Sequence, residues 1–373
     1  MTGMARRLAA AARWPAASTS AGIHARVRWL DVLREGEGVE VPLRLLGGTT
    51  GTDVERRAEA LRALYRCARV EVVADRLRGD WATVVLHRSV FPDVCDYPAL
   101  GPAERVVPLA AVSPLPLGVD TRGRPVGLPL FTSAGGSSVL VGGVPGSGKT
   151  GTLRTLLAGL APTTASIVII DPTGGAEAAL WRERTSASVL SAEAEPTVEL
   201  LSELLALIER RGRVLGAGAT TGMLPPVVLV CDELAELAAA GTTRQQEDAR
   251  TLLRRVVALG RKANVSCVLA TQRTTATSID VTTRSLAAWR IALAHPGDVH
   301  GSEAILGAGR REAAELSKGD VGVAYVTSGG VPSLVRVYRV DEEQALCASR
   351  RGVWRSMSEL AELDEALLRE LRS

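Results

Sequence analysis

A glycine-rich loop near the middle of the chain constrains its fold and chemistry more than any other stretch. Residues 138–150 read Ser-Val-Leu-Val-Gly-Gly-Val-Pro-Gly-Ser-Gly-Lys-Thr and match the pattern G-x-x-x-x-G-K-[ST]. The apolar run 139–141 predicts a buried strand before the loop, and leucines at helical spacing predict a helix after it. Backbone N–H groups of such a loop and of the helix N-terminus cradle phosphates. The stretch therefore predicts a nucleotide-binding strand–loop–helix unit.

The lysine of this loop is unusual in this chain. The 44 lysines and arginines include only three lysines, at positions 149, 262 and 318. Lysine suits a position where a compact charge fits phosphate better than a planar guanidinium. We therefore expect Lys149 to contact the β- and γ-phosphates of ATP and the Thr150 hydroxyl to hold Mg²⁺, and we reject a chance glycine-rich turn. The residues expected to bind the nucleotide form one run: Gly143, Pro145, Gly146, Ser147, Gly148, Lys149, Thr150 and Gly151.

A second apolar run ends in two acids. Residues 227–231 predict a buried strand that is followed directly by Asp232 and Glu233. In an open parallel sheet such acids emerge at the carboxyl end of the strand, beside the phosphate loop. We expect Asp232 to bind Mg²⁺, mostly through water, and Glu233 to polarise the attacking water. The alternative is a strand that ends in Asp-Glu by chance, which the preceding phosphate loop makes the weaker interpretation.

A third apolar run, residues 265–270, ends in Thr271, Gln272 and Arg273. A polar side chain at the tip of a strand beside the acidic strand can sense the γ-phosphate through a hydrogen bond. We assign this catalytic role to Gln272. The alternative is that Thr271 and Gln272 only satisfy the backbone of the following loop.

The rest of the chain predicts an α/β protein in five segments. Strands and helices alternate after residue 130, which implies a mostly parallel sheet covered on both faces. Eight prolines between residues 92 and 129 oppose regular structure there. The expected segments are a flexible basic arm (1–22), a small α+β N-terminal module (23–90), a proline-rich connector (91–130), a P-loop domain (131–340) and a C-terminal helical tail (341–373).

Within the small module, the residue pattern predicts four strands and one helix that Thr52 or Asp53 can cap. The strands are expected over residues 27–33, 39–46, 70–73 and 81–86. The module has no catalytic constellation, so assembly or docking is its expected role. In the tail, residues 356–371 predict an amphipathic helix that packs against the domain.

Cysteines and hydropathy indicate a cytoplasmic protein. The five cysteines are scattered and contain no C-x-x-C pair, which disfavours zinc sites and disulfide frameworks. No apolar run reaches the ~18 residues that a membrane span needs. The net charge of +3 is too small to indicate nucleic acid by itself.

Several short stretches resemble the motor domains of the FtsK/SpoIIIE family. The most specific is Val-Leu-Ala-Thr-Gln-Arg at residues 268–273, and another is Asp-Glu-Leu-Ala-Glu-Leu at 232–237. The others are residues 117–126, 169–172, 208–211, 259–263 and 318–320. The resemblance spans residues 115–340 and implies a RecA-like P-loop ATPase core. It also implies a ring, usually a homo-hexamer, that pumps double-stranded DNA. The actinobacterial plasmid-transfer branch resembles this chain most, because it too is arginine-rich and has a compact N-terminal module.

The chain departs from this family in places, and other functions stay open. Thr173 stands where the family often has lysine. Neither a membrane anchor nor a C-terminal winged helix is visible, so a membrane-anchored partner protein is a further expectation. One alternative is an ATPase for type VII-style protein secretion, which shares this fold and these motifs. The other is a non-enzymatic ATP-gated scaffold, which the complete set of Asp232, Glu233 and Gln272 disfavours.

The resemblance also suggests which arginines act between subunits and on DNA. Arg261 aligns with the Gly-Arg step of the family and is the candidate that reaches the γ-phosphate of a neighbour; Arg273 is the alternative, and either residue alone could be a solvated arginine. The helix expected over residues 243–264 carries a basic face, which suits DNA phosphates but also a solvated surface. The expected pore segments are residues 240–244 and 273–284, with Arg244 and Arg284 as DNA contacts.

Overall fold

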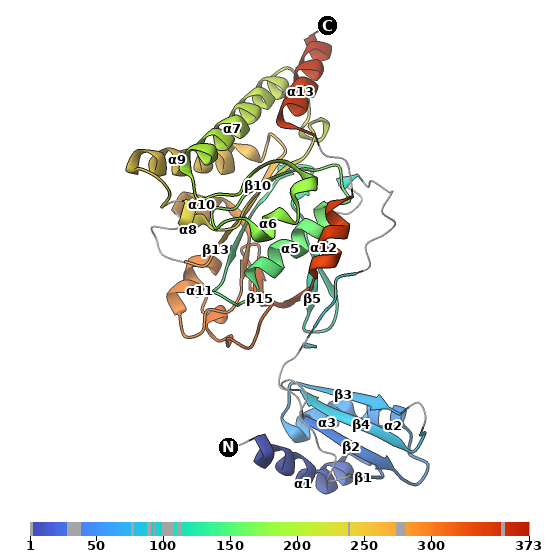
Figure 1. Ribbon diagram of the computed structural model, residues 1–373. Coiled ribbons are helices and arrows are strands. Elements are labelled where there is room, and N and C mark those ends of the chain that lie inside the picture. Colours follow the sequence, from blue (N-terminus) through green and yellow to red (C-terminus); the bar gives the residue numbers. More distant parts are fainter. Residues whose placement is uncertain are drawn as a thin grey trace. The chain divides into compact units, whose positions relative to one another are not determined.

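The chain forms two compact units, Met1–Val94 and Cys95–Ser373 (Figure 1). The computed structural model describes residues 3–27, 39–75, 78–87, 91–92, 94–98, 108–109, 114–237, 239–273, 281–351 and 355–372. Within these ranges no helix combines the length and apolarity required to cross a bilayer. Each unit is described by itself.

The first unit is a four-stranded antiparallel sheet with helices packed on its apolar face. The strand order is β1-β2-β4-β3. Its strands are β1 (Ala25–Val27), β2 (Val39–Leu45), β3 (Arg69–Ala74) and β4 (Trp81–His87), and its helices are α1 (Gly3–Ala21), α2 (Gly51–Arg56) and α3 (Ala58–Tyr65). The strand expected over residues 27–33 lies outside the described residues except for Val27.

The N-terminal segment is a helix, so the expectation of a flexible basic arm over residues 1–22 is wrong for the described part. Helix α1 is rich in alanine, the strongest helix former. Trp14 is 1% exposed, packs in the core of the unit and donates its indole N–H to the Ala25 carbonyl at 3.1 Å. Ala11, Ala17 and Ala21 are buried on the same face as Trp14, and small alanines of this kind are a weak amphipathic signal in a sequence.

The helix cap of this unit is also displaced from its expected position. Thr50 caps α2, and its hydroxyl accepts from the Asp53 N–H while the Asp53 carboxylate accepts from the Thr50 N–H at 2.8 Å. This reciprocal capping box satisfies two backbone donors at once. Asp53 is therefore the third residue of the helix, and Thr52 is not the cap.

The second unit is built on a ten-stranded sheet, whose order is β11-β10-β12-β13-β9-β14-β15-β16-β5-β6. The six strands from β11 to β14 pair in parallel and the remaining strands are antiparallel. The strands are β5 (Leu115–Asp120), β6 (Pro125–Leu128), β9 (Ser138–Gly142), β10 (Ser166–Ile170), β11 (Thr185–Val189), β12 (Val227–Cys231), β13 (Val265–Thr271), β14 (Ala287–Ala292), β15 (Val323–Thr327) and β16 (Ser333–Val337). A small hairpin joins β7 (Phe131–Thr132) and β8 (Gly135–Gly136).

Helices cover both faces of this sheet, as the apolar runs predict. Alternate residues of each central strand enter two separate cores, one that includes α5 and α12 and one that includes α7, α9 and α13. Figure 1 shows α7, α9 and α13 grouped together, with α5, α6 and α12 on another side of the unit. The helices are α5 (Lys149–Leu160), α6 (Ala176–Ala179), α7 (Ala194–Gly216), α8 (Leu234–Leu237), α9 (Thr243–Gly260), α10 (Val281–Leu286), α11 (Val299–Leu306), α12 (Glu342–Ser349) and α13 (Met357–Arg372).

The proline-rich segment is not an extended connector throughout, which corrects the boundary expected at residue 130. Its second half forms β5 and β6, which extend the sheet on its antiparallel side. Pro125 begins β6, an edge strand, where its missing N–H costs no ladder hydrogen bond. Most of residues 99–113 lie outside the described residues.

A short stretch at the start of the second unit is fastened to its last strand segment. Asp96 pairs with Arg339 in a parallel bridge. The Tyr97 N–H donates to the Arg339 carbonyl at 3.0 Å, and the Arg339 N–H donates to the Cys95 carbonyl at 2.7 Å. The neighbouring Tyr338 carbonyl accepts from the Thr155 hydroxyl of α5 at 2.6 Å. Residues 95–97 are therefore linked through one strand segment to the helix that begins at Lys149.

The C-terminal helix α13 packs on α7 through a buried ion pair, in agreement with its expected packing role. The Arg211 guanidinium donates to the Asp364 carboxylate at 2.9 Å and to the Ala263 carbonyl at 2.8 Å. Both side chains are almost fully buried, at 0% and 1% exposure. Burial raises the pKa of the Asp364 carboxyl, and the Arg211 guanidinium opposes that rise. Outside this core, Arg210 pairs with Glu365 at 3.2 Å.

Replacing Arg211 alone tests how much this pair holds α13. Arg211→Met leaves the Asp364 carboxylate buried without its counter-charge, so we expect the free energy of unfolding to fall by ~3–5 kcal/mol. The double variant Arg211→Met/Asp364→Leu should recover most of that loss. Urea denaturation measures both, and Arg210→Met is the matched control, with an expected loss of ~0–1 kcal/mol. Equal losses for Arg211→Met and Arg210→Met would contradict the assignment.

Candidate active site

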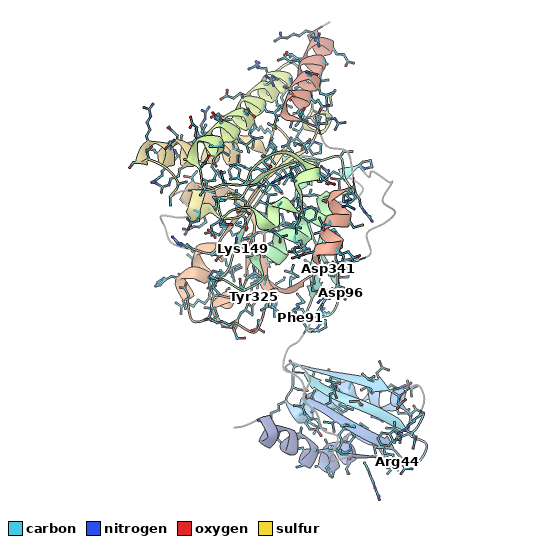
Figure 2. All side chains as sticks on the ribbon, viewed as in Figure 1. Arg44, Phe91, Asp96, Lys149, Tyr325 and Asp341 are labelled. Atoms are coloured by element: carbon cyan, nitrogen blue, oxygen red, sulfur yellow. The ribbon has the colours of Figure 1, made fainter. Side chains whose placement is uncertain are left out.

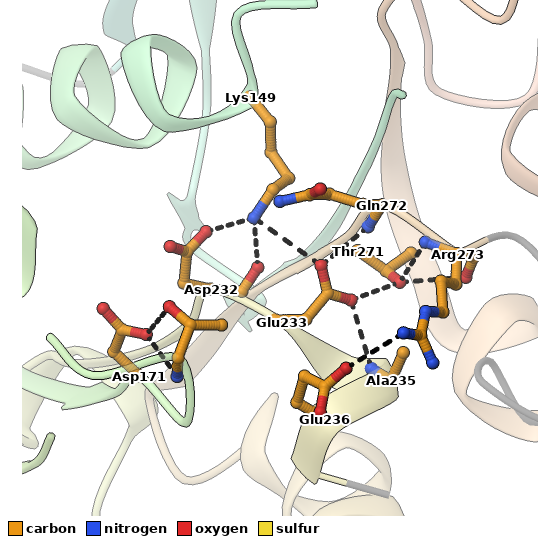
Figure 3. A network of polar contacts seen from close by, with 10 residues as sticks. Lys149, Asp171, Asp232, Glu233, Ala235, Glu236, Thr271, Gln272 and Arg273 are labelled. Carbon is orange, nitrogen blue, oxygen red and sulfur yellow. Dashed lines mark hydrogen bonds and ion pairs between the residues drawn. The ribbon is translucent and has the colours of Figure 1, made fainter. Parts of the chain in front are cut away.

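The sheet topology brings the phosphate loop, Asp232, Glu233 and Gln272 together at the carboxyl ends of three strands. Strand β13 lies between β12 and β9, and all three run in parallel. Their carboxyl ends therefore meet, which brings together the phosphate loop after β9, Asp232 and Glu233 after β12, and Gln272 after β13. Figure 2 shows the Lys149 side chain within the second unit, and Figure 3 shows this edge from close by.

The phosphate loop has the backbone conformation that its glycines predict. Gly146 and Gly148 have φ values of 80° and 102°, in the left-handed region that favours glycine. A Cβ on Gly148 would lie 2.7 Å from the Gly322 nitrogen, so this position also excludes any side chain by contact. Helix α5 then begins at Lys149, which directs its free N–H groups toward the loop.

Three neighbouring segments hold the loop in place through its backbone. The Gly143 N–H donates to the Thr271 carbonyl at 3.4 Å, and the Val144 N–H donates to the Ala294 carbonyl at 3.2 Å. The Ser147 carbonyl accepts from the Gly322 N–H at 2.9 Å. Gly322 comes two residues after the Lys-Gly-Asp stretch at residues 318–320, so the structure places that stretch near the phosphate loop in the chain.

Lys149 lies at the centre of the polar network in Figure 3. It is 4% exposed. Its ammonium donates to the Asp232 carbonyl at 2.6 Å and to the Asp232 carboxylate, and it lies 3.9 Å from Glu233 Oε2. Two carboxylates thus compensate a cation that would be costly to bury alone. The lysine predicted to bind phosphates is adjacent to both acids predicted for metal and water.

The residues expected to hold Mg²⁺ fit that ion. Asp232 contacts Lys149, and Thr150 is the next residue of α5, so both predicted ligands flank the same lysine. A carboxylate and a hydroxyl are hard oxygen ligands, and Mg²⁺ usually takes one or two protein ligands plus phosphate and water. The described residues include no cluster of three His, Cys, Asp or Glu that could enclose a metal.

Glu233 is buried and held by the end of β13. It is 4% exposed. Its Oε1 accepts from the Thr271 hydroxyl at 2.7 Å and from the Ala235 N–H at 3.2 Å, and its Oε2 accepts from the Gln272 N–H at 2.9 Å. Fixed donors orient a carboxylate, as a general base requires. The sequence analysis considered Thr271 only as a residue that satisfies the following loop backbone. No feature of the sequence indicates its hydrogen bond to Glu233.

The remaining predicted residues occupy different positions. Gln272 is exposed, and Figure 3 draws its side chain on the same side as the Lys149 ammonium. Arg273 pairs with Glu236 at 3.4 Å, with both side chains largely exposed. Arg261 lies at the opposite end of β13, in the turn after α9, where its carbonyl accepts from the Gly136 N–H at 3.0 Å. A seven-residue strand spans about 23 Å, so Arg261 is remote from the phosphate loop of its own chain.

A buried arginine that the sequence analysis did not identify caps the C-terminus of helix α5. Arg184 is 1% exposed and donates to the carbonyls of Ala161 at 2.7 Å, Thr163 at 2.8 Å and Ala165 at 2.8 Å. Burial lowers the pKa of its guanidinium to about 10. A cation at a helix C-terminus satisfies free carbonyls and favours the helix dipole. Among so many arginines, no pattern distinguishes this one.

Two substitutions separate binding from hydrolysis. Lys149→Ala removes the only ammonium of the network in the described residues and should abolish ATP binding. Glu233→Gln keeps the size of the side chain and should bind ATP but hydrolyse it about 10²-fold or more slowly, because the amide cannot accept a proton from water. Equilibrium binding of a fluorescent ATP analogue and steady-state phosphate release measure the two effects. Near-normal turnover by Glu233→Gln would show that another carboxylate activates the water.

The segment around the phosphate loop is similar to known proteins. Residues 110–223, which include the phosphate loop and end before Asp232, match the FtsK/SpoIIIE family. The type VII secretion system protein EssC of Staphylococcus aureus is 26% identical over 180 residues, which is 43% of this chain and 12% of EssC. The chain thus matches only a small part of the length of these curated relatives.

Solved structures share the fold. The pCW3 conjugation coupling protein TcpA, solved as a monomer with ATPγS, has a TM-score of 0.59 at 15% identity and covers 91% of this chain and 96% of its own. The cytoplasmic domain of the type VII secretion ATPase EccC of Thermomonospora curvata has a TM-score of 0.54 at 23% identity, over 71% of this chain and 33% of its own. Residues 110–223 thus match the FtsK/SpoIIIE family, and the fold and the geometry of the site support ATP hydrolysis by a P-loop ATPase unit.

Proposed function

We propose that this protein is a translocase for double-stranded DNA that hydrolyses ATP with Mg²⁺ at the subunit interfaces of a ring, expected to be a homo-hexamer. The observation that carries the proposal is a complete hydrolytic set, Lys149, Asp232, Glu233 and Gln272, in a chain whose whole domain plan is similar to that of a conjugation coupling protein. The match covers nearly all of both chains, so it includes the N-terminal module as well as the ATPase unit. Conjugation moves DNA between cells.

The surface chemistry of α9 supports contacts to DNA phosphates. Arg244, Arg250 and Arg254 are exposed along this helix. Arg255 is partly engaged, since it pairs with Glu209 of α7 at 2.8 Å. A motor that moves along any sequence binds phosphates rather than base edges, and each such contact releases counterions. Duplex binding should therefore be independent of sequence and weaken steeply as salt concentration rises.

The segments proposed for the pore follow catalytic strand ends. Residues 240–244 come after the helix that follows Glu233, and Arg244 lies in the first turn of α9. Arg284 lies in α10, where its carbonyl accepts from the Arg290 guanidinium at 3.2 Å. The middle of the other proposed segment, residues 274–280, lies outside the described residues. Both segments are close in sequence to residues that contact the nucleotide site, so ATP could move them.

Alanine variants test these DNA contacts. Arg244→Ala and Arg284→Ala should reduce the stimulation of ATPase by duplex DNA several-fold while basal ATPase stays unchanged, because neither is among the residues assigned to ATP, Mg²⁺ or the attacking water. Arg369→Ala, on the exposed side of α13, is the control for loss of one surface charge. ATPase is measured with and without duplex at two salt concentrations. Absence of both duplex binding at low salt and stimulation would overturn the translocase proposal.

An arginine supplied by a neighbouring subunit would complete each site. Arg261 is remote from its own phosphate loop, exposed, and located at the other edge of the sheet. Such an arginine is worth about 10³-fold or more in other phosphoryl-transfer enzymes. Arg273, beside Glu236 at the catalytic edge, is the alternative.

Mixed rings test the action of Arg261 in trans. Arg261→Ala and Lys149→Ala subunits should each be inactive alone, and their mixture should regain part of the ATPase activity. The gain arises because some interfaces combine an intact phosphate loop with an intact Arg261. A mixture of Arg273→Ala and Lys149→Ala subunits tests the alternative in the same assay. If neither mixture gains activity while both assemble, the proposal of a trans arginine is wrong.

A second function is favoured by the similarity to EssC, a type VII secretion system protein, and to EccC, a type VII secretion ATPase. In that case the ATPase would respond to a peptide rather than to DNA. Adding candidate secretion peptides to the assay above discriminates between the two: stimulation by peptide and not by duplex would favour secretion.

A further inference from the structure

Besides the Lys149 ammonium at 3.9 Å, three hydrogen-bond donors among the described residues hold the Glu233 carboxylate, and one of these three is a side chain. The N–H groups of Ala235 and Gln272 belong to the backbone and persist in nearly any substitution. The third donor is the Thr271 hydroxyl, 2.7 Å from Oε1. Thr271 is 0% exposed, so no water can replace its hydroxyl without a change in packing.

The hydroxyl proton of Thr271 has two acceptors within reach. The Arg273 carbonyl lies 2.9 Å from Oγ1, and the Arg273 N–H donates to Oγ1 at 3.1 Å. The Glu233 carboxylate is closer and charged, and hydrogen bonds to charged acceptors are the stronger ones. The proton therefore belongs to the Glu233 contact, while Oγ1 accepts from Arg273.

Thr271 also contacts the phosphate loop. Its carbonyl accepts from the Gly143 N–H at 3.4 Å, at the first glycine of the loop. One buried residue thus connects the loop that binds phosphates, the carboxylate assigned to water activation and the chain that continues to Gln272. These contacts come from different elements, β9, β12 and β13, so Thr271 sets their mutual geometry.

We propose that Thr271 is a positioning residue for hydrolysis, which acts by orienting the Glu233 carboxylate toward the attacking water. This inference rests on the proposed role of Glu233 but not on DNA as the substrate. Thr271 does not contact the nucleotide in this proposal, so its loss should affect kcat and leave the KM for ATP nearly unchanged.

The test compares Thr271→Val, which keeps the shape and removes the hydroxyl, with Thr271→Ser, which keeps the hydroxyl. In basal ATPase without DNA, Thr271→Val should lower kcat about tenfold or more with KM within about twofold, and Thr271→Ser should retain most of the activity. In a Glu233→Gln background, Thr271→Val should cause no further loss, because the group it orients is gone. Thermal unfolding of each variant monitors the fold.

Several outcomes would overturn the proposal. Equal kcat for Thr271→Val and wild type would exclude the positioning role, as would additive losses in the Glu233→Gln background. A parallel rise in KM would indicate that Thr271 acts on the phosphate loop instead. If Glu233→Gln itself keeps normal turnover, the assignment of Glu233 fails first, which separates that failure from failure at Thr271.

Discussion

The ammonium of Lys149, enclosed between Asp232 and Glu233, is the interaction on which the site depends. A buried cation requires compensating carboxylates, and the two acids must emerge beside the loop that carries it. Parallel pairing of β9, β13 and β12 provides that arrangement, because all three strands end at one edge. The buried apolar runs that drive these strands into the sheet therefore also determine where the charges lie.

The catalytic edge could be predicted from the sequence because its signals are local. The phosphate loop needs glycines at fixed offsets; the positive φ values explain Gly146 and Gly148, and at Gly148 a short contact to Gly322 also excludes a side chain. Asp232, Glu233 and Gln272 follow short apolar runs that are rich in valine, and the length and composition of such runs predict buried strands. The strand order itself could not be read from these runs, although the mostly parallel sheet with helices on both faces is confirmed.

Features that depend on contacts distant in sequence escaped prediction. Arg184 caps the C-terminus of α5, and Arg211 pairs with Asp364 to join α7 to α13. In an arginine-rich chain, no sequence signal indicates the buried contacts of these two arginines. The helix α1 was missed because its buried positions recur at helical spacing but are, apart from Trp14, mostly small alanines, which give a weak hydrophobic pattern. Strands β5 and β6 were missed because proline is read as opposing a strand, but Pro125 begins the edge strand β6 and Pro116 lies at an irregularity of the β5–β6 pairing.

The fastening of residues 95–97 to the segment around Arg339 has a mechanical consequence. Any force that the preceding chain exerts reaches the ATPase unit first at two backbone hydrogen bonds, Tyr97 to Arg339 and Arg339 to Cys95. Both strand segments point the same way, so a pull along them loads these bonds together rather than one after another. Helix α5, which begins at Lys149, is connected to the same segment, because the Thr155 hydroxyl donates to the Tyr338 carbonyl. Tension on residues 95–97 is therefore transmitted to the helix that carries the phosphate-binding lysine.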